Sequence, residues 1–136
     1  MIWDESDDTG LCLPPEGYDF DLEEQVTLGA NDLLEVADSL TNHYRKVISI
    51  RNKYSNIYDG EVSSVDMGNS AIFALQYVDG TNDDEVLVVH NFSESEQTIT
   101  IDTNLEIVDN VVVQGKNARK TNSTLIISPF STVILQ

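Results

Sequence analysis

The chain has 136 residues, a length that fits one domain with a modest hydrophobic core. Its formal net charge at pH 7 is −17, and all seven basic residues lie at Arg45 or beyond. A surface with this much negative charge repels phosphate backbones and anionic bilayers. In addition, no apolar run reaches the ~20 residues of a membrane-spanning helix. We therefore expect no nucleic-acid partner and no membrane association.

Residues 1–30 show no sustained hydrophobic period, and prolines and glycines interrupt them, which predicts an irregular segment. The first residues, MIWDESDD, lack the basic and apolar regions of a signal peptide. Cys12 is the only cysteine, which excludes an internal disulfide and a CxxC motif. An irregular stretch of this length is unusual in a compact domain, so we expect the chain to be the end of something larger.

One long amphipathic helix is predicted over about residues 32–54. Asn31 or Asp32 is expected to begin it, with Glu35 closing a capping box. Apolar side chains recur every three or four positions and share one helical face: Leu33, Ala37, Leu40, Tyr44, Val47, Ile48 and Tyr54. No second helix follows to cover this face, so its cover must be the β-rich part, the N-terminal segment or a second copy of the chain.

From Glu61 onward the apolar pattern alternates with a period of two. Seven strands are expected, at residues 61–66, 71–78, 85–92, 97–102, 107–114, 123–128 and 131–136. Short strands without intervening helices predict a mainly β fold. The expected architecture is an antiparallel Greek-key β-sandwich, preceded by one long α-helix and an irregular N-terminal segment.

One face of each strand is expected to form the core of the sandwich. The predicted core pairs are Phe73 and Leu75, Val86 and Val88, Ile99 and Ile101, Val111 and Val113, Leu125 and Ile127, and Val133 and Leu135. A register slip of one residue would turn a whole strand's set of side chains toward solvent.

The run SLTNHYRKVISIRN, the later Gly60 and the strand VLVVHNFSES resemble the α-amylase family of glycoside hydrolases. In that family the last barrel helix carries a similar pattern and leads through a short glycine turn into a C-terminal β-sandwich. The matching helix positions are Ser39, Leu40, Asn42, Tyr44, Arg45, Lys46, Ile48, Arg51 and Asn52. MIWD, EEQ at 23–25 and the closing STVILQ are also similar to family segments, so the resemblance covers essentially the whole chain.

The resemblance implies that residues 1–60 are the end of a (β/α)₈ barrel and that residues 61–136 form the C-terminal β-sandwich domain. A complete barrel needs about 250 residues, and the family's catalytic residues belong to earlier barrel strands. The chain is therefore expected to be a non-catalytic fragment without cofactors. Its parent would be a secreted or cell-envelope enzyme that hydrolyses α-glucosidic bonds in starch-like glucans, and its sandwich would stabilise the missing catalytic barrel and contact glucan.

A free-standing β-sandwich that binds carbohydrate or a protein is the alternative function. Such sugar-binding sandwiches usually expose two or three aromatic side chains on one face. The aromatic residues of the β-rich part are Phe73, Tyr77, Phe92 and Phe130. Their mostly alternating, inward-looking positions favour the scaffold function.

Trp3, Asp4 and Tyr18 are the candidate substrate-binding residues. The resemblance puts their segment on the catalytic face of the barrel, where an aromatic ring can stack on a sugar; packing of Trp3 against the barrel is the simpler role. His43 and His90 have no Ser or Cys partner at a recognisable spacing, so both are expected to be structural. Residues 79–84 lack the ligand order of an EF-hand loop, so a polar hairpin is expected there and no metal site.

Overall fold

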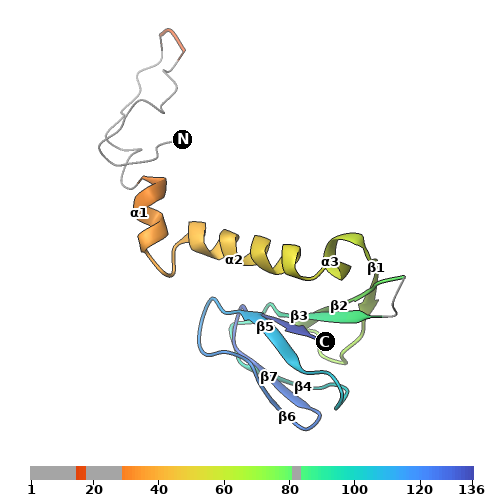
Figure 1. Ribbon diagram of the computed structural model, residues 1–136. Coiled ribbons are helices and arrows are strands. Elements are labelled where there is room, and N and C mark those ends of the chain that lie inside the picture. Colours follow the sequence, from red (N-terminus) through yellow and green to blue (C-terminus); the bar gives the residue numbers. More distant parts are fainter. Residues whose placement is uncertain (1–14, 18–28, 81–83) are drawn as a thin grey trace. The chain divides into compact units, whose positions relative to one another are not determined.

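The computed structural model describes residues 15–17, 29–80 and 84–136 (Figure 1). The chain divides into two compact units, residues 1–46 and residues 47–136. Within the described part, no helix is long and apolar enough to cross a membrane.

Two helices replace the single helix that was predicted over residues 32–54. α1 covers Ala30–Glu35 and α2 covers Leu40–Lys53. The Asp32 carboxylate accepts the Gly29 N–H at 2.9 Å, so Asp32 supports the first turn of α1 rather than preceding it. The end of α2 agrees with the expected stop, but the prediction of one continuous helix is wrong.

The junction between α1 and α2 explains the break. The Ser39 hydroxyl accepts the N–H of Asn42 at 3.2 Å and donates to the Leu33 carbonyl. The Asn42 side-chain amide donates to the carbonyls of Leu34 and Val36, at 2.9 and 2.8 Å. Ser39 thus caps the start of α2, and Asn42 satisfies carbonyls at the end of α1 that a continuous helix would satisfy itself.

Residues 47–136 contain the end of α2, the short helix α3 (Asn56–Asp59) and eight strands in two antiparallel sheets (Figure 1). The strands are β1 Glu61–Val65, β2 Ile72–Val78, β3 Glu85–Asn91, β4 Gln97–Thr100, β5 Ile107–Val111, β6 Arg119–Thr121, β7 Thr124–Ile127 and β8 Thr132–Leu135. The larger sheet has the order β1-β2-β3-β8-β5, and the smaller sheet has the order β4-β7-β6. The predicted antiparallel β-sandwich is confirmed, and connections between the sheets bring β4 beside β7 and β5 beside β8.

One strand, β6, was not among the seven that were predicted. Its sequence is RKT, which carries no apolar alternation, and it forms by antiparallel pairing of Lys120 with Leu125 on β7. β5 is also shorter than expected, because it ends at Val111. Its register with β8 shifts between Ile107 and Asp109.

The space between the two sheets holds the main hydrophobic core. Its buried residues are Ala74, Leu87, Val89, Ile99, Ile101, Leu125, Ile127, Val133 and Leu135. The predicted interior pairs of β4, β7 and β8 are confirmed, since each of these residues is buried there.

A second hydrophobic core lies on the outer face of the larger sheet. Its buried residues are Ile50, Tyr54, Val86, Val88, Val111 and Ile134, with Ile57 and Tyr77 packed against them. The end of α2 covers this face: the Tyr54 hydroxyl donates to the Val108 carbonyl at 3.3 Å, and Lys53 pairs with Asp109 at 3.4 Å. β3 and β8 are therefore buried on both faces.

The predicted facing is wrong for β2 and for the end of β5, and the predicted core residues Val86, Val88 and Val111 are buried on the outer face rather than between the sheets. Phe73 is 45% exposed and Val113 is 65% exposed, whereas the small side chain of Ala74 is 1% exposed. Because the segment 71–78 is apolar on both of its faces, the larger side chains do not identify the interior face. Val113 lies beyond the last paired residue of β5.

Gly60, which joins α3 to β1, is required by a close approach of backbone atoms. A Cβ at this position would lie 2.6 Å from the Asn56 carbonyl oxygen and 2.7 Å from the Val78 carbonyl oxygen. Both neighbours are backbone atoms and cannot rotate away. The glycine turn of the sequence resemblance thus has a steric cause.

We expect the contact between α2 and the sheet to stabilise the sandwich. Ile50→Ala should lower the free energy of unfolding of the 136-residue chain by about 2–3 kcal/mol, because Ile50 is 8% exposed in the second core. Ile48→Ala makes the same change on the same helix at a side chain that is 54% exposed, and should cost less than about 0.5 kcal/mol. Urea denaturation measures both values, and equal losses would contradict the assigned packing.

Candidate functional site

The predicted substrate-binding residues Trp3, Asp4 and Tyr18 lie outside the described residues, so their role stays a prediction. The described part offers three other features that a function could use. They are the polar network around Asn91, the aromatic side chains around His90, and a cleft at the edge of the sandwich.

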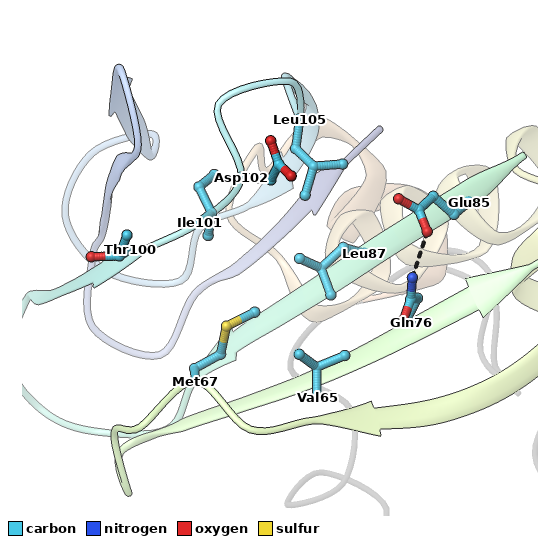
Figure 2. Close-up of a pocket in the computed structure, with 9 residues that line it drawn as sticks. All are labelled: Val65, Met67, Gln76, Glu85, Leu87, Thr100, Ile101, Asp102 and Leu105. Atoms are coloured by element: carbon cyan, nitrogen blue, oxygen red, sulfur yellow. Dashed lines mark hydrogen bonds between the residues drawn. The ribbon is translucent and has the colours of Figure 1, made fainter.

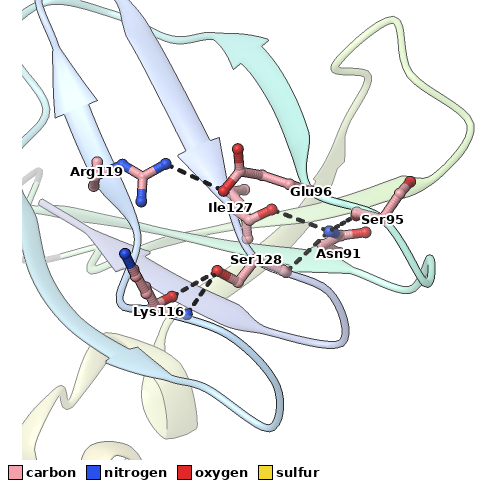
Figure 3. A network of polar contacts seen from close by, with 7 residues as sticks. All are labelled: Asn91, Ser95, Glu96, Lys116, Arg119, Ile127 and Ser128. Carbon is pink, nitrogen blue, oxygen red and sulfur yellow. Dashed lines mark hydrogen bonds and ion pairs between the residues drawn. The ribbon is translucent and has the colours of Figure 1, made fainter.

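Asn91, at the end of β3, is 1% exposed and joins three segments of the sandwich (Figure 3). Its side-chain amide nitrogen donates to the carbonyls of Ser95 at 2.8 Å, Ser128 at 2.9 Å and Ile127 at 3.2 Å. Its side-chain oxygen accepts the backbone N–H and the hydroxyl of Ser93, at 2.9 and 2.8 Å. The polar residues of the HNFS motif are therefore structural: they connect the two sheets at one end.

Ser128 extends this network to the loop after β5 (Figure 3). Its hydroxyl donates to the Lys116 carbonyl at 2.7 Å and accepts the Lys116 N–H at 3.1 Å. Gly115, with φ +100°, allows the close approach, because a Cβ there would lie 2.9 Å from the Ser128 hydroxyl. These contacts satisfy backbone groups of the loop, so the Ser128 hydroxyl serves a structural role.

His90 packs beside two phenylalanine rings on the outer face of the larger sheet. Its ring centroid is 6.2 Å from that of Phe73 and 5.7 Å from that of Phe92, with interplanar angles of 21° and 29°. Its Nδ1 lies 2.9 Å from the Thr132 hydroxyl. Burial lowers the pKa of His90 below its ordinary value of 6.5. The side chain is thus a neutral packing residue at neutral pH, in line with the structural role expected for it.

Three of the four aromatic residues expected to look inward are exposed. Phe73, Phe92 and Phe130 are 45%, 65% and 43% exposed, and Tyr77 is partly buried against the second core. The inward-looking expectation was therefore wrong for the phenylalanines. Sequence alternation missed the result because these residues lie on the outer sheet face or in a strand connection.

A cleft of about 270 Å³ opens between the sheets at one edge of the sandwich (Figure 2). Apolar side chains form much of its lining: Val65, Met67, Leu87, Ile101 and Leu105. The Glu85 carboxylate accepts a hydrogen bond from the Gln76 amide, and the Asp102 carboxylate accepts the Asn104 N–H at 2.9 Å. Since both carboxylates serve strand and turn contacts, and the cleft is smaller than common ligand pockets of ~300–1,000 Å³, we assign it no acid–base chemistry.

The acidic stretch at 79–84 connects β2 to β3 as a hairpin. The Asp79 N–H donates to the Asp84 carbonyl at 2.9 Å, and the strands continue with Val78 paired to Glu85. Residues 81–83 lie outside the described part. Among residues 15–17, 29–80 and 84–136, no group of three or more His, Cys, Asp or Glu side chains is placed to hold a metal ion.

Comparison with known proteins gives a consistent result for the sandwich. Residues 75–134 match the family described as the alpha-amylase SusG C-terminal domain. Over 124 residues the chain is 29% identical to Alpha-amylase 3 of Dictyoglomus thermophilum, covering 91% of this chain and 22% of that protein. The chain thus spans about a fifth of the length of this relative.

Solved structures show the same fold. Eubacterium rectale Amy13B superposes with a TM-score of 0.79 at 20% identity, over 99% of this chain and 26% of that one. The alpha-amylase from H. orenii superposes with a TM-score of 0.64 at 22% identity, over 80% of this chain and 22% of that one.

The network around Asn91 is expected to stabilise the sandwich strongly. Asn91→Ala should lower the free energy of unfolding by about 2–4 kcal/mol, because it removes the hydrogen-bond donor of two buried carbonyls, those of Ile127 and Ser128. Asn117→Ala, at an exposed position, is the matched control and should cost less than about 0.5 kcal/mol. Chemical denaturation of both variants tests this, and a mild effect at Asn91 would show that the network contributes little.

Protonation of His90 should destabilise the fold. Because burial lowers the pKa of His90 in the folded chain, the unfolded chain takes up the proton first as the pH falls below about 7, and the stability then decreases. His90→Gln should remove this part of the pH dependence. Urea denaturation between about pH 7.5 and about pH 5 gives the free energy of unfolding of both chains. On acidification this free energy should fall more for the parent than for the His90→Gln variant. Parallel curves would contradict the assignment.

Proposed function

We propose that this chain is the non-catalytic end of an enzyme that hydrolyses α-glucosidic bonds in starch-like glucans, because residues 75–134 match the family described as the alpha-amylase SusG C-terminal domain. Residues 1–60 would supply the end of the catalytic barrel, and residues 61–136 the domain that stabilises it. The observation that carries this proposal is the family match of the sandwich. The role of Asn91 and Ser93 in holding the sheets together supports a scaffold, since the most characteristic strand motif performs no chemistry.

The proposal places substrate hydrolysis in the barrel. The 136-residue chain should release no reducing sugar from soluble starch, and the longer enzyme that carries it should do so. Retention on insoluble starch distinguishes the alternative of a carbohydrate-binding module, for which exposed aromatic side chains are the expected feature. Hydrolysis by the chain alone would contradict the proposal, and tight retention of the chain would support the alternative instead.

The same assay tests the proposed substrate contacts of Trp3, Asp4 and Tyr18. If Trp3 stacks on a sugar ring at a distant subsite, Trp3→Ala in the longer enzyme should raise KM for starch several-fold with little change in kcat. The reason is that such a contact stabilises the bound substrate and the transition state equally, so its loss weakens binding without raising the barrier from the bound state. An unchanged KM would leave Trp3 a packing residue.

We also propose that the longer enzyme acts outside the cell or in the cell envelope. Recovery of its activity in the cytosol alone would contradict that location.

A further inference from the structure

Two adjoining cavities form a groove beside β4, the outermost strand of the smaller sheet. The cleft of about 270 Å³ between the sheets shares Met67 and Thr100 with a second cavity of about 500 Å³. The second cavity lies between β4 and the connection from β1 to β2, and its lining is mainly polar: Met67, Gly68, Asn69, Ser70, Thr98, Ile99, Thr100 and Thr124. We name the two cavities together the edge groove.

In the part of the chain that the structure describes, β4 is the last strand of the smaller sheet and pairs there with β7. The Ile101 N–H donates to the carbonyl of Ser123, directly before β7, at 2.8 Å. Since alternate residues of an antiparallel strand bond to the same neighbour, Ile99 also bonds to β7. The backbone N–H and C=O groups of Thr98 and Thr100 therefore point away from β7, into the edge groove. A strand edge of this kind can accept a further strand.

The larger sheet provides the opposite wall for such a strand. Val65 on β1 lines the cleft together with Thr100 (Figure 2), and it packs against the main core. Glu61 and Ser63 share the face of Val65, because alternate residues of a strand point to one side, and both are exposed. The larger sheet thus extends past β4, so that one more strand beside β4 would face β1 and fill the cleft.

The lining of the edge groove favours an extended peptide over a sugar. None of the described residues that line the two cavities is aromatic, so no ring is offered to the face of a sugar. The apolar cleft is smaller than the ~300–1,000 Å³ of common ligand pockets, and its size suits a side chain rather than a whole ligand. An added strand uses both parts, because its backbone bonds to the free edge and alternate side chains enter a pocket.

The charge of the edge groove selects a basic segment. Among the described residues that line it, two are carboxylates, Glu85 and Asp102, and none is lysine or arginine. Each carboxylate accepts one hydrogen bond from a neighbour, from Gln76 and Asn104 respectively, and a carboxylate can accept several. The net charge of −17 attracts a cationic segment and repels a second copy of the chain.

We propose that the edge groove binds an extended protein segment of basic and apolar residues, which adds to the smaller sheet as a strand beside β4. The backbone of the segment bonds to Thr98 and Thr100, an apolar side chain fills the cleft, and a lysine or arginine pairs with Glu85 or Asp102. This surface belongs to the sandwich itself, so the inference goes beyond the proposed function and does not depend on it.

A fluorescein-labelled peptide with blocked ends, Lys-Leu-Thr-Val-Thr-Lys, tests the proposal on the 136-residue chain. Fluorescence anisotropy should show saturable binding with a Kd on the order of 10–100 µM, because the contact is short. A peptide with prolines in place of the valine and the following threonine lacks the backbone donors that reach β4, and should bind at least about tenfold more weakly. A peptide with glutamates in place of both lysines should also bind more weakly.

Variants of the chain locate the binding site. Thr100→Pro removes an N–H that points into the edge groove but no bond to β7, and should weaken peptide binding at least about tenfold. Glu85→Gln should weaken binding about two- to fivefold, whereas Glu94→Gln makes the same change at an exposed position outside the groove and should leave binding unchanged. Urea denaturation shows whether each variant is folded. If Thr100→Pro does not fold, the proline peptide on the parent chain decides the question instead.

Four results would overturn the inference. A parent chain that shows no saturable binding up to about 1 mM peptide has no such site. Equal binding of the proline peptide would exclude strand addition, and equal effects of Glu85→Gln and Glu94→Gln would reduce the contact to general charge attraction. Displacement of the peptide by maltohexaose would make the occupant a glucan. Sedimentation of the parent as a dimer that Thr100→Pro dissociates would make the occupant a second copy.

Discussion

The middle strands of the larger sheet, β3 and β8, require cover on both faces, and the rest of the domain is arranged around that requirement. An antiparallel sheet often leaves one face to solvent, but Val86 to Val89 and Val133 to Leu135 are apolar without interruption. The smaller sheet covers one face through the main core. The end of α2 covers the other through Ile50 and Tyr54. The end of α2, from Val47 onward, is thus a structural layer of the sandwich unit.

This arrangement determines which features the sequence could predict. The start of the β-rich part at Glu61 and the end of the helix near Tyr54 follow from a change in apolar period, and both were predicted. The facing of β2 was not predicted correctly. Because this strand has apolar residues on both faces, the alternation of its sequence does not identify the face that points between the sheets. β6 carries no apolar signal of its own, and the break before Ser39 depends on side-chain hydrogen bonds that no periodicity reveals.

The residues that carried the family resemblance prove to be mainly structural. Ser39 and Asn42 make the hydrogen bonds that join α1 to α2. Gly60 has no Cβ that would clash with two carbonyl oxygens, and Asn91 and Ser93 connect the sheets. Such positions tolerate few alternatives, since each has a specific steric or hydrogen-bonding cause. The sequence pattern therefore identified the fold well. It gave no guide to the exposure of Phe73 and Phe92.

Native-state hydrogen exchange of the 136-residue chain tests most directly whether α2 and both sheets form one unit. If the second core is an integral layer, the amides of Ile50 and Tyr54 should exchange with the same free energy as the central amides of β3 and β8, through global unfolding. If the helix amides exchange several orders of magnitude faster while β3 and β8 remain fully protected, the outer face does not need its cover, and the account is wrong.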